Sequence, residues 1–142
     1  TQNEYSLLCR LYDLDMAEMS HHENISLLAY SPLAGGFLTG KYMEDKVPNN
    51  SRLSRVPSLF GRINDNSTLA VKEYVSLAKT YNLDPVHMAL AFCNQRPFMG
   101  SVIFGATDNI QLTNILKGLD VVLSEEIMLE INKLYKRFPI TF

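Results

Sequence analysis

Apolar residues fall into short runs along the chain, and the runs predict alternating strands and helices. Residues 25–30 (Ile-Ser-Leu-Leu-Ala-Tyr) and 101–104 (Ser-Val-Ile-Phe) are compact, mostly apolar runs typical of buried strands. We expect residues 2–8 to be a strand end that runs into a loop, and residues 14–22 to form a helix. The first part of the chain therefore predicts a strand–helix–strand unit, in which the helix crosses between two parallel strands.

The second half of the chain has apolar positions at the three- and four-residue spacing of helices. Polar caps predict where these helices begin: Asp84 before Pro85, Thr107 or Asp108, and Ser124. The positions expected to face the core are Val71, Tyr74, Val75 and Ala78 in a helix from Ser67; Met88, Ala91 and Phe92 in the next; Leu112, Ile115, Leu116 and Leu119 in the third; and Ile127, Ile131 and Leu134 in the last.

Residues 44–66 are polar, lack periodicity and carry two prolines and three arginines, Arg52, Arg55 and Arg62. A solvated loop is one interpretation. A structureless loop of this length is unusual inside a compact domain, and such loops often close over a ligand. The sequence leaves both interpretations open.

The predicted order is strand, helix, strand, loop, two helices, strand, two helices, which is typical of parallel α/β structure. Three strands alone would leave two open edges and exposed apolar faces, so we interpret the chain as the last part of a larger sheet. Its 142 residues are well short of the roughly 250 of a complete (β/α)₈ barrel. Glycine turns follow the second and third predicted strands, and such a barrel binds phosphate after strands seven and eight.

The loop at residues 30–42 (Tyr-Ser-Pro-Leu-Ala-Gly-Gly-Phe-Leu-Thr-Gly-Lys-Tyr) carries the most informative chemistry. Gly35 and Gly36 would let backbone N–H groups approach a phosphate, and Lys41 adds a positive charge. Gly35, Gly40 and Lys41 also fit the P-loop spacing, but Tyr42 stands where a P-loop has Ser or Thr, which disfavours a nucleoside triphosphate. A dinucleotide site at a strand end and a plain strand-to-loop turn both remain possible.

The charge and the lengths of the apolar runs argue against two classes of function, nucleic-acid binding and membrane insertion. The net charge is −2 and the sequence pI about 5.9, with the basic residues scattered, so we do not expect nucleic-acid binding. No apolar run approaches the roughly 20 residues of a membrane span, and we expect a cytoplasmic protein without membrane partners. The first residue is Thr1 and the first methionine is Met16, so we expect translation to start upstream.

The cysteines and histidines do not form a recognisable motif. Cys9 and Cys93 lack CxxC spacing, and we expect both to be reduced and structural. His21 and His22 fall at a predicted helix end and His87 lies alone on a polar helix position, so no metal site is expected.

Four separated motifs, in this order and spacing, resemble the aldo-keto reductases. They are residues 2–8 (Gln-Asn-Glu-Tyr-Ser-Leu-Leu), residues 30–42, residues 84–90, and residues 102–107 (Val-Ile-Phe-Gly-Ala-Thr) with Gln111 and Leu112. Within that family the chain is most similar to the Tas-type bacterial enzymes. It is also similar to the aflatoxin aldehyde reductases and to the β subunits of voltage-gated potassium channels.

The resemblance implies that residues 1–142 are the C-terminal half of a (β/α)₈ barrel that binds NADPH, with strands six to eight and the terminal helices. By this resemblance Gln2 would bind the nicotinamide carboxamide, and Tyr30 would stack on the nicotinamide ring. The pyrophosphate would lie against Ser31, Pro32, Leu33, Ala34, Gly35 and Gly36. Lys41 and Arg52 would face the phosphates of the adenosine half, and Gly105, Thr107 and Gln111 would hold the adenosine end. Where the family commonly has Glu-Asn after this glutamine, the chain has Asn114 and Ile115, and Asn114 is taken as the remaining contact.

The family's Asp, Tyr, Lys and His tetrad lies on the first four strands, and none of those positions exists in this chain. No catalytic residue is therefore assigned. Within a complete barrel the expected function is reduction of an aldehyde or ketone by NADPH. The expected partner is a polypeptide that carries the N-terminal half of the barrel. Without that partner, the chain is expected to associate with itself. Two alternatives would fit the same residues: a non-catalytic cofactor-sensing module similar to the channel β subunits, and an inactive fragment. The sequence does not predict whether the site prefers NADP or NAD.

Overall fold

The computed structural model describes residues 1–142 apart from the side chain of Asp45. Three strands form one sheet in the order β1 (Gln2–Glu4), β2 (Leu27–Tyr30), β3 (Met99–Ile103), and both pairs are parallel. Glu4 is paired with Tyr30, and Tyr30 with Ile103, so the three strands end side by side. The predicted parallel α/β arrangement is confirmed for these three strands.

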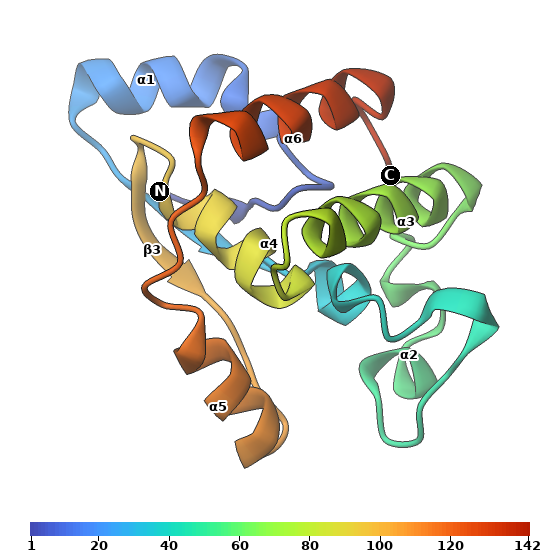
Figure 1. Ribbon diagram of the computed structural model, residues 1–142. Helices are drawn as coiled ribbons and strands as arrows, with labels where there is room; N and C mark the ends of the chain where they lie inside the picture. Colours follow the sequence, from blue (N-terminus) through green and yellow to red (C-terminus); the bar gives the residue numbers. More distant parts are fainter.

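The helices connect and cover the strands (Figure 1). The α-helices are α1 (Asp15–Glu23), α2 (Arg52–Arg55), α3 (Asp65–Thr80), α4 (Pro85–Asn94), α5 (Asn109–Lys117) and α6 (Glu125–Arg137). Short 3₁₀ turns lie at Leu11–Asp13, Ala34–Thr39, Met43–Asp45 and Pro57–Leu59. Two of these elements, α2 and the 3₁₀ turn at Pro57–Leu59, fall inside the segment of residues 44–66 that we predicted to be irregular. Ser51 caps α2 by accepting a hydrogen bond from the Ser54 N–H.

Predicted caps are confirmed at three helices. Asp84, Asp108 and Ser124 each accept a backbone N–H at the start of their helix. The helix expected from Ser67 instead begins at Asp65. Its N-cap is Asn64, and Ser67 is the third helical residue of a reciprocal capping box. The predicted start of this helix is therefore two residues too late.

One face of the sheet is covered and the other is open. In β2, Leu27 and Ala29 are fully buried, whereas Leu28 and Tyr30 are about two-fifths exposed. The alternation follows from the period-two geometry of a strand, with α4 packed against the buried side near β3. The strand pattern was apolar on both sides, so the sequence predicted two covered faces; within this chain only one is covered.

The core lies between the sheet and helices α3, α4 and α6. Every position predicted to face inward on α3 and α4 is buried. On α6, Ile127 and Ile131 are buried and Leu134 is partly buried. The amphipathic pattern of these helices was therefore a correct guide, because each packs one apolar stripe against the covered face of the sheet.

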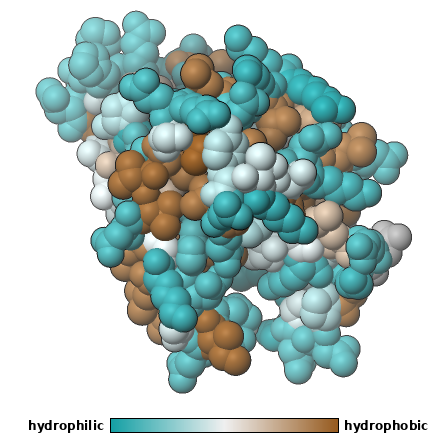
Figure 2. All heavy atoms as spheres, in the orientation of Figure 1, coloured by the Kyte–Doolittle hydropathy of each residue, from teal (hydrophilic) through white to brown (hydrophobic). Residues whose placement is uncertain are grey.

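Helix α5 departs from the prediction. Of its expected inward positions only Ile115 is buried, while Leu112, Leu116 and Leu119 are exposed and Ile110 is 83% exposed. The helix extends away from the body of the molecule in Figure 1, and apolar side chains reach the surface there in Figure 2. Its apolar stripe is thus present in the sequence but has no neighbouring element to cover it among the described residues.

The predicted strand bounds shift by one or two residues. Strand β2 begins at Leu27 rather than Ile25, since Ile25 and Ser26 are exposed before the strand enters the sheet. Strand β3 begins at Met99 and ends at Ile103, so Phe104 lies beyond it. The pairing of β2 with β3 has an irregularity between Leu27 and Leu28, which a periodicity argument does not detect.

Several absences apply to the described part of the chain. No helix there is long and apolar enough to cross a membrane. No group of three or more His, Cys, Asp or Glu side chains within it is arranged to hold a metal ion. Cys9 and Cys93 are both free thiols, and Cys93 is completely buried, as expected for structural cysteines.

A buried ionic cluster joins three separate segments. Asp13 accepts hydrogen bonds from the Arg10 guanidinium at 2.7 Å and from the Tyr5 hydroxyl at 2.6 Å. The Arg96 guanidinium lies 3.4 Å from the same carboxylate, and Arg10 also donates to Asn132 of α6 at 2.9 Å. Two guanidinium groups therefore share one carboxylate away from water, which makes Asp13 a point where a single change has a large effect.

Stability is expected to fall at high pH. Burial is the largest cause that raises the pKa of the Cys93 thiol and of the Tyr5 and Tyr74 hydroxyls. These groups ionise near pH 8.5 and 10 when unfolded, and a raised folded pKa means that their contribution is complete below about pH 8.5 and is lost as the pH rises above it. Urea unfolding at increasing pH measures the loss. A flat profile up to about pH 10.5 would contradict it, and Cys93→Ala should delay its onset.

Candidate functional site

The carboxyl ends of β2 and β3 bring Tyr30 and the two predicted glycine turns to the same end of the sheet. Tyr30 is the last residue of β2 and Ser31 follows it, while Gly105 lies two residues beyond the end of β3. Because Tyr30 is paired with Ile103, both turns lie at the same edge of the sheet. The parallel topology predicts that Tyr30, Ser31 and Gly105 lie at adjacent strand ends, and the register of β2 with β3 confirms it.

Gln2 lies on the neighbouring strand β1, two residues further from that end of the sheet. It is paired with Leu28, two residues before Tyr30. In a parallel pair, registered neighbours point to the same face, so Gln2, Leu28 and Tyr30 share the open face of the sheet. The amide of Gln2 and the ring of Tyr30 are thus exposed on one surface.

The turn after β2 depends on backbone conformations that favour glycine. Gly35 and Gly36 have φ of +70° and +92°, and Gly40 has φ of +77°. These angles are strained for residues with a Cβ, so the two adjacent glycines let the chain reverse immediately beyond the strand end. Ser31 and Ala34 also have positive φ, which places unfavourable backbone geometry at the candidate site.

The prediction that the Gly36 amide is free to approach a phosphate is wrong for this conformation. The Gly36 N–H donates to Leu33 O at 2.9 Å, and the Ala34 N–H donates to Ser31 O at 2.8 Å. These two amides are used within the turn. What the turn presents instead is two cationic side chains, Lys41 and Arg52, packed directly against the glycines.

Lys41 and Arg52 lie against the glycine pair. A Cβ added to Gly36 would stand 3.1 Å from both Cε and Nζ of Lys41, and one added to Gly35 would stand 3.5 Å from Cδ of Arg52. The two cations therefore come from separate segments of the chain to the same short turn. Among the side chains that the structure describes, neither has a carboxylate within ion-pair distance.

Tyr42 has a structural role. It is buried, the Lys41 ammonium lies 5.1 Å from its ring centroid, and its hydroxyl accepts the Leu53 N–H at 3.4 Å. The tyrosine thereby ties α2, which carries Arg52, to the turn. A short 3₁₀ turn rather than a long helix follows Lys41, so the geometry does not support the P-loop alternative.

The second strand-end turn forms a small polar network. The Gln111 side chain accepts the Thr107 N–H at 3.3 Å and donates to the Thr107 hydroxyl and to Asp108, each at 2.8 Å. No atom lies within 4 Å of a Cβ built on Gly105, so this turn is open to solvent. Gly105, Thr107 and Gln111 are consequently close together on an exposed surface, as the resemblance implies.

Asn114 is engaged differently from the other predicted residues. Its side-chain amide donates to the Asp84 carboxylate at 3.1 Å, and its main-chain carbonyl oxygen lies 2.7 Å from Nε2 of His87. These contacts hold α5 to the start of α4. His87, which looked like an isolated polar residue in the sequence, lies tightly against Gly118 at the end of α5.

Two further residues border the site and were not assigned from the sequence. The Arg62 guanidinium donates two hydrogen bonds to the Glu4 carboxylate, at 2.8 and 2.7 Å. These hydrogen bonds are the main cause that raises the pKa of Arg62. Glu4 is the register partner of Tyr30 at the strand ends. The motif at residues 2–8 contained Glu4 and the loop contained Arg62, but nothing in the sequence paired them across 58 residues.

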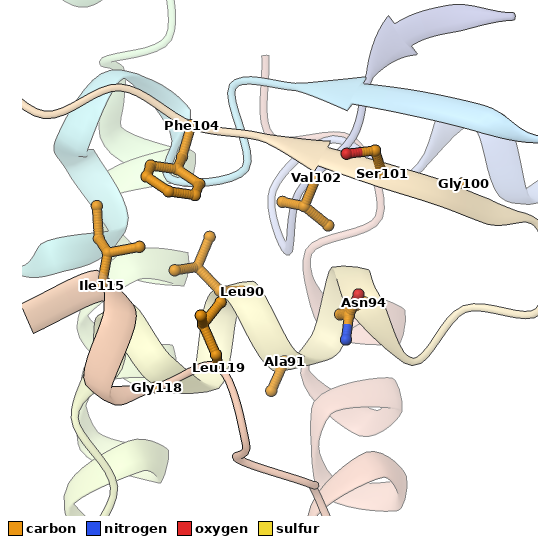
Figure 3. Close-up of a pocket in the computed structure, with 10 residues that line it drawn as sticks. All are labelled: Leu90, Ala91, Asn94, Gly100, Ser101, Val102, Phe104, Ile115, Gly118 and Leu119. Atoms are coloured by element: carbon orange, nitrogen blue, oxygen red, sulfur yellow. The ribbon is translucent and has the colours of Figure 1, made fainter. Parts of the chain in front are cut away.

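A pocket of about 250 Å³ lies elsewhere, between α4, β3 and α5 (Figure 3). It is lined by Leu90, Ala91, Asn94, Gly100, Ser101, Val102, Phe104, Ile115, Gly118 and Leu119. This lining contains no cation and none of the predicted cofactor residues. A dinucleotide carries several negative charges and needs a site larger than this, so the strand ends with Lys41 and Arg52 are the better candidate.

Comparison with known proteins places the chain in a class. A solved glycerol dehydrogenase from Gluconobacter oxydans superposes with a TM-score of 0.74 at 21% identity, over 96% of this chain and 42% of that one. The fold is therefore a partial α/β fold that matches part of a barrel enzyme. The chain belongs to the aldo/keto reductase family, whose model matches residues 1–136.

Individual relatives agree with this membership. The chain is 41% identical to Protein tas of Escherichia coli, over 95% of its own length and 39% of that protein's. It is 41% identical to an aldo-keto reductase of Babesia bovis, with 78% and 41% covered, and 31% identical to a probable voltage-gated potassium channel subunit beta of Oryza sativa subsp. japonica, with 97% and 44% covered. The chain thus spans about two-fifths of the length of these relatives.

Proposed function

We propose that this chain is the NADPH-binding, C-terminal portion of an aldo-keto reductase and carries the strands that a complete barrel numbers six to eight. One observation carries the proposal: Lys41 and Arg52 converge on the Gly35–Gly36 turn at the end of β2. The contact is direct at Gly36, where a Cβ would crowd Cε and Nζ of Lys41 at 3.1 Å. Two cations beside one strand-end turn suit the negative charge of a diphosphate.

Each end of the cofactor has matching residues. The exposed ring of Tyr30 offers a flat surface for the nicotinamide, and the amide of Gln2 on the same face offers hydrogen bonds to its carboxamide. The network of Thr107 and Gln111 beside Gly105 offers polar contacts to the adenosine end. Asn114 keeps a packing role in this proposal, because Asp84 already occupies its side-chain amide.

NADPH would supply the hydride in carbonyl reduction, and the protein must supply a proton donor. We infer that the proton donor belongs to the remainder of the barrel. In this proposal residues of the chain bind and orient the cofactor, and a cytoplasmic location remains a prediction.

The proposal is tested by titrating the chain with NADPH and following nicotinamide fluorescence. We expect saturable binding with a dissociation constant below about 1 mM, which corresponds to at least about 4 kcal/mol of binding free energy. Adenosine 2′-phosphate should compete, because it shares the adenosine half that Lys41 and Arg52 are proposed to face. No binding up to that concentration would contradict the proposal.

The isolated chain is expected to reduce no aldehyde, even when it binds NADPH. The reason is chemical: none of its residues is proposed to donate a proton to the carbonyl oxygen. Absorbance at the nicotinamide band with a reactive aldehyde measures turnover. Steady turnover by the purified chain would show that a catalytic group lies among residues 1–142. A chain that binds NADPH without turnover also fits a cofactor-sensing role, which its similarity to the channel β subunit favours as the second candidate.

A further expectation concerns association. The open face of the sheet, the edges of β1 and β3 and the exposed stripe of α5 would be covered in a complete barrel, so a polypeptide that carries the other strands is the proposed partner. Alone, the chain is expected to self-associate. Sedimentation across a concentration series, with and without a separately produced N-terminal half, measures this. A concentration-independent monomer that ignores the added half would contradict it.

A further inference from the structure

Glu4 and Arg62 connect the strand ends to the segment that carries Arg52. Their side chains are about one-sixth exposed, and the two parallel hydrogen bonds form the bidentate geometry that is strongest for a guanidinium and a carboxylate. Arg62 also donates to Leu59 O at 2.9 Å, and its guanidinium carbon lies 6.0 Å from the ring centroid of Phe60 and 5.6 Å from that of Phe142. This pair is therefore better ordered and better desolvated than an ordinary surface ion pair.

The segment that the pair holds, residues 57–63, has strained backbone; we call it the strap. Ser58, Leu59, Phe60 and Gly61 have φ of +56°, +49°, +60° and +84° in succession. Only the last is a glycine, and three consecutive L-residues in the left-handed region are costly. Such a conformation persists only when surrounding contacts impose it.

Two contacts impose it, one at each side of the turn. Leu59 is completely buried, and its methyl carbons would lie 3.6 and 3.7 Å from a Cβ on Gly35. Arg62 is held by Glu4. The strap thus runs from the glycine turn to the end of β1, and Arg52 lies beside the same glycine that Leu59 supports.

We propose that the Glu4–Arg62 pair is a latch that holds the strap in its strained conformation. Glu4 and Arg62 thereby act as positioning residues for Gly35, Gly36 and Arg52. The cofactor part of this inference rests on the proposed NADPH site. Breaking the latch releases the strained turn, withdraws Leu59 from beneath Gly35 and loosens the phosphate-facing cations. A bound dinucleotide would then dissociate faster while its direct contacts are chemically unchanged.

Amide hydrogen exchange tests the latch without any cofactor. Within the strap, the Leu59 N–H donates to Val56 O and the Ile63 N–H to Ser58 O; in the glycine turn, the Gly36 N–H donates to Leu33 O. In Glu4→Gln and in Arg62→Gln we expect about tenfold faster exchange at the strap amides, since a hydrogen bond to a charged group is lost, and a smaller acceleration at Gly36. The reversed pair, Glu4→Arg with Arg62→Glu, should restore protection.

A matched control removes an ion pair elsewhere. Glu73→Gln breaks the exposed contact with Arg137 on α3 and α6 and should leave the strap and Gly36 unchanged. Unchanged exchange at the strap amides in both single variants would overturn the latch. Faster exchange in the strap with an unchanged Gly36 would overturn its coupling to the turn.

NADPH dissociation measured by stopped-flow gives the second readout, with about tenfold faster release expected in the single variants. Equal release rates in all variants would overturn the coupling to the cofactor. If the unchanged chain binds no NADPH, the proposed function fails, while the exchange at Leu59, Ile63 and Gly36 still decides whether the latch positions the turn. The two failures are therefore distinguishable.

Discussion

Replacing Lys41 and Arg52 together by glutamine is expected to weaken NADPH binding about a hundredfold. Each side chain is proposed to make a charge-assisted contact to a phosphate, and such contacts contribute about 1.5 kcal/mol or more each, which makes about 3 kcal/mol for the pair. Both cations lie against the Gly35–Gly36 turn. Fluorescence titration of the double variant beside the unchanged chain measures the loss.

The matched control for this prediction removes the same two kinds of charge from α6. Lys133→Gln with Arg137→Gln breaks two exposed ion pairs and lowers the net charge equally. Binding should change little, except for a small screened effect that disappears with added salt. Equal weakening in both double variants would mean that only overall charge matters and that Lys41 and Arg52 have no site of their own.

Replacing Asp13 by asparagine is expected to lower the free energy of unfolding by about 3–5 kcal/mol, which is a large share of the total stability of a domain. The carboxylate is the shared partner of Arg10 and Arg96 and accepts the Tyr5 hydroxyl, all in a desolvated cluster. Without it, the buried guanidinium of Arg10 and the partly buried one of Arg96 have no counter-charge. Urea unfolding followed by circular dichroism measures the change.

An exposed carboxylate gives the comparison for Asp13. Glu130→Gln removes the partner of Lys133 at the surface of α6 and should cost less than about 1 kcal/mol. Adding Arg96→Gln to Asp13→Asn should recover part of the loss, because one uncompensated charge is removed. A loss below about 1 kcal/mol for Asp13→Asn would contradict the importance assigned to the cluster.

Local signals in the sequence predicted the elements that depend on local chemistry. Asp84, Asp108 and Ser124 cap their helices as expected, because an N-cap bond joins residues two or three positions apart. The apolar stripes of α3 and α4 were also correct guides to burial. The same stripe on α5 was a poor guide, since no element among the described residues covers Leu112, Leu116 or Leu119.

The candidate site was predictable where one motif contains the whole feature. The glycine turn after β2 and its lysine are within eleven residues of one another, and the strand-end placement of Tyr30 and Gly105 follows from parallel topology. The contacts that pair distant residues were not predictable from pattern. Glu4 with Arg62, and Asp13 with Arg96, are separated by 58 and 83 residues, and no periodicity relates them.

The error about the Gly36 amide has a different, local cause. Glycines in a loop suggest free N–H groups, but Gly36 donates to Leu33 in a tight turn that its own positive φ makes possible. The conformation that glycine permits decides whether the amide faces outward or inward, and composition alone does not specify it.

The most direct test of the central claim is a titration of the isotopically labelled chain with NADPH, followed by amide chemical shifts. A cofactor at the carboxyl ends of the strands predicts the largest changes at Ser31, Gly36, Lys41 and Gly105, with saturation below about 1 mM. Changes confined to the lining of the pocket between α4, β3 and α5, or no changes at that concentration, would contradict the account.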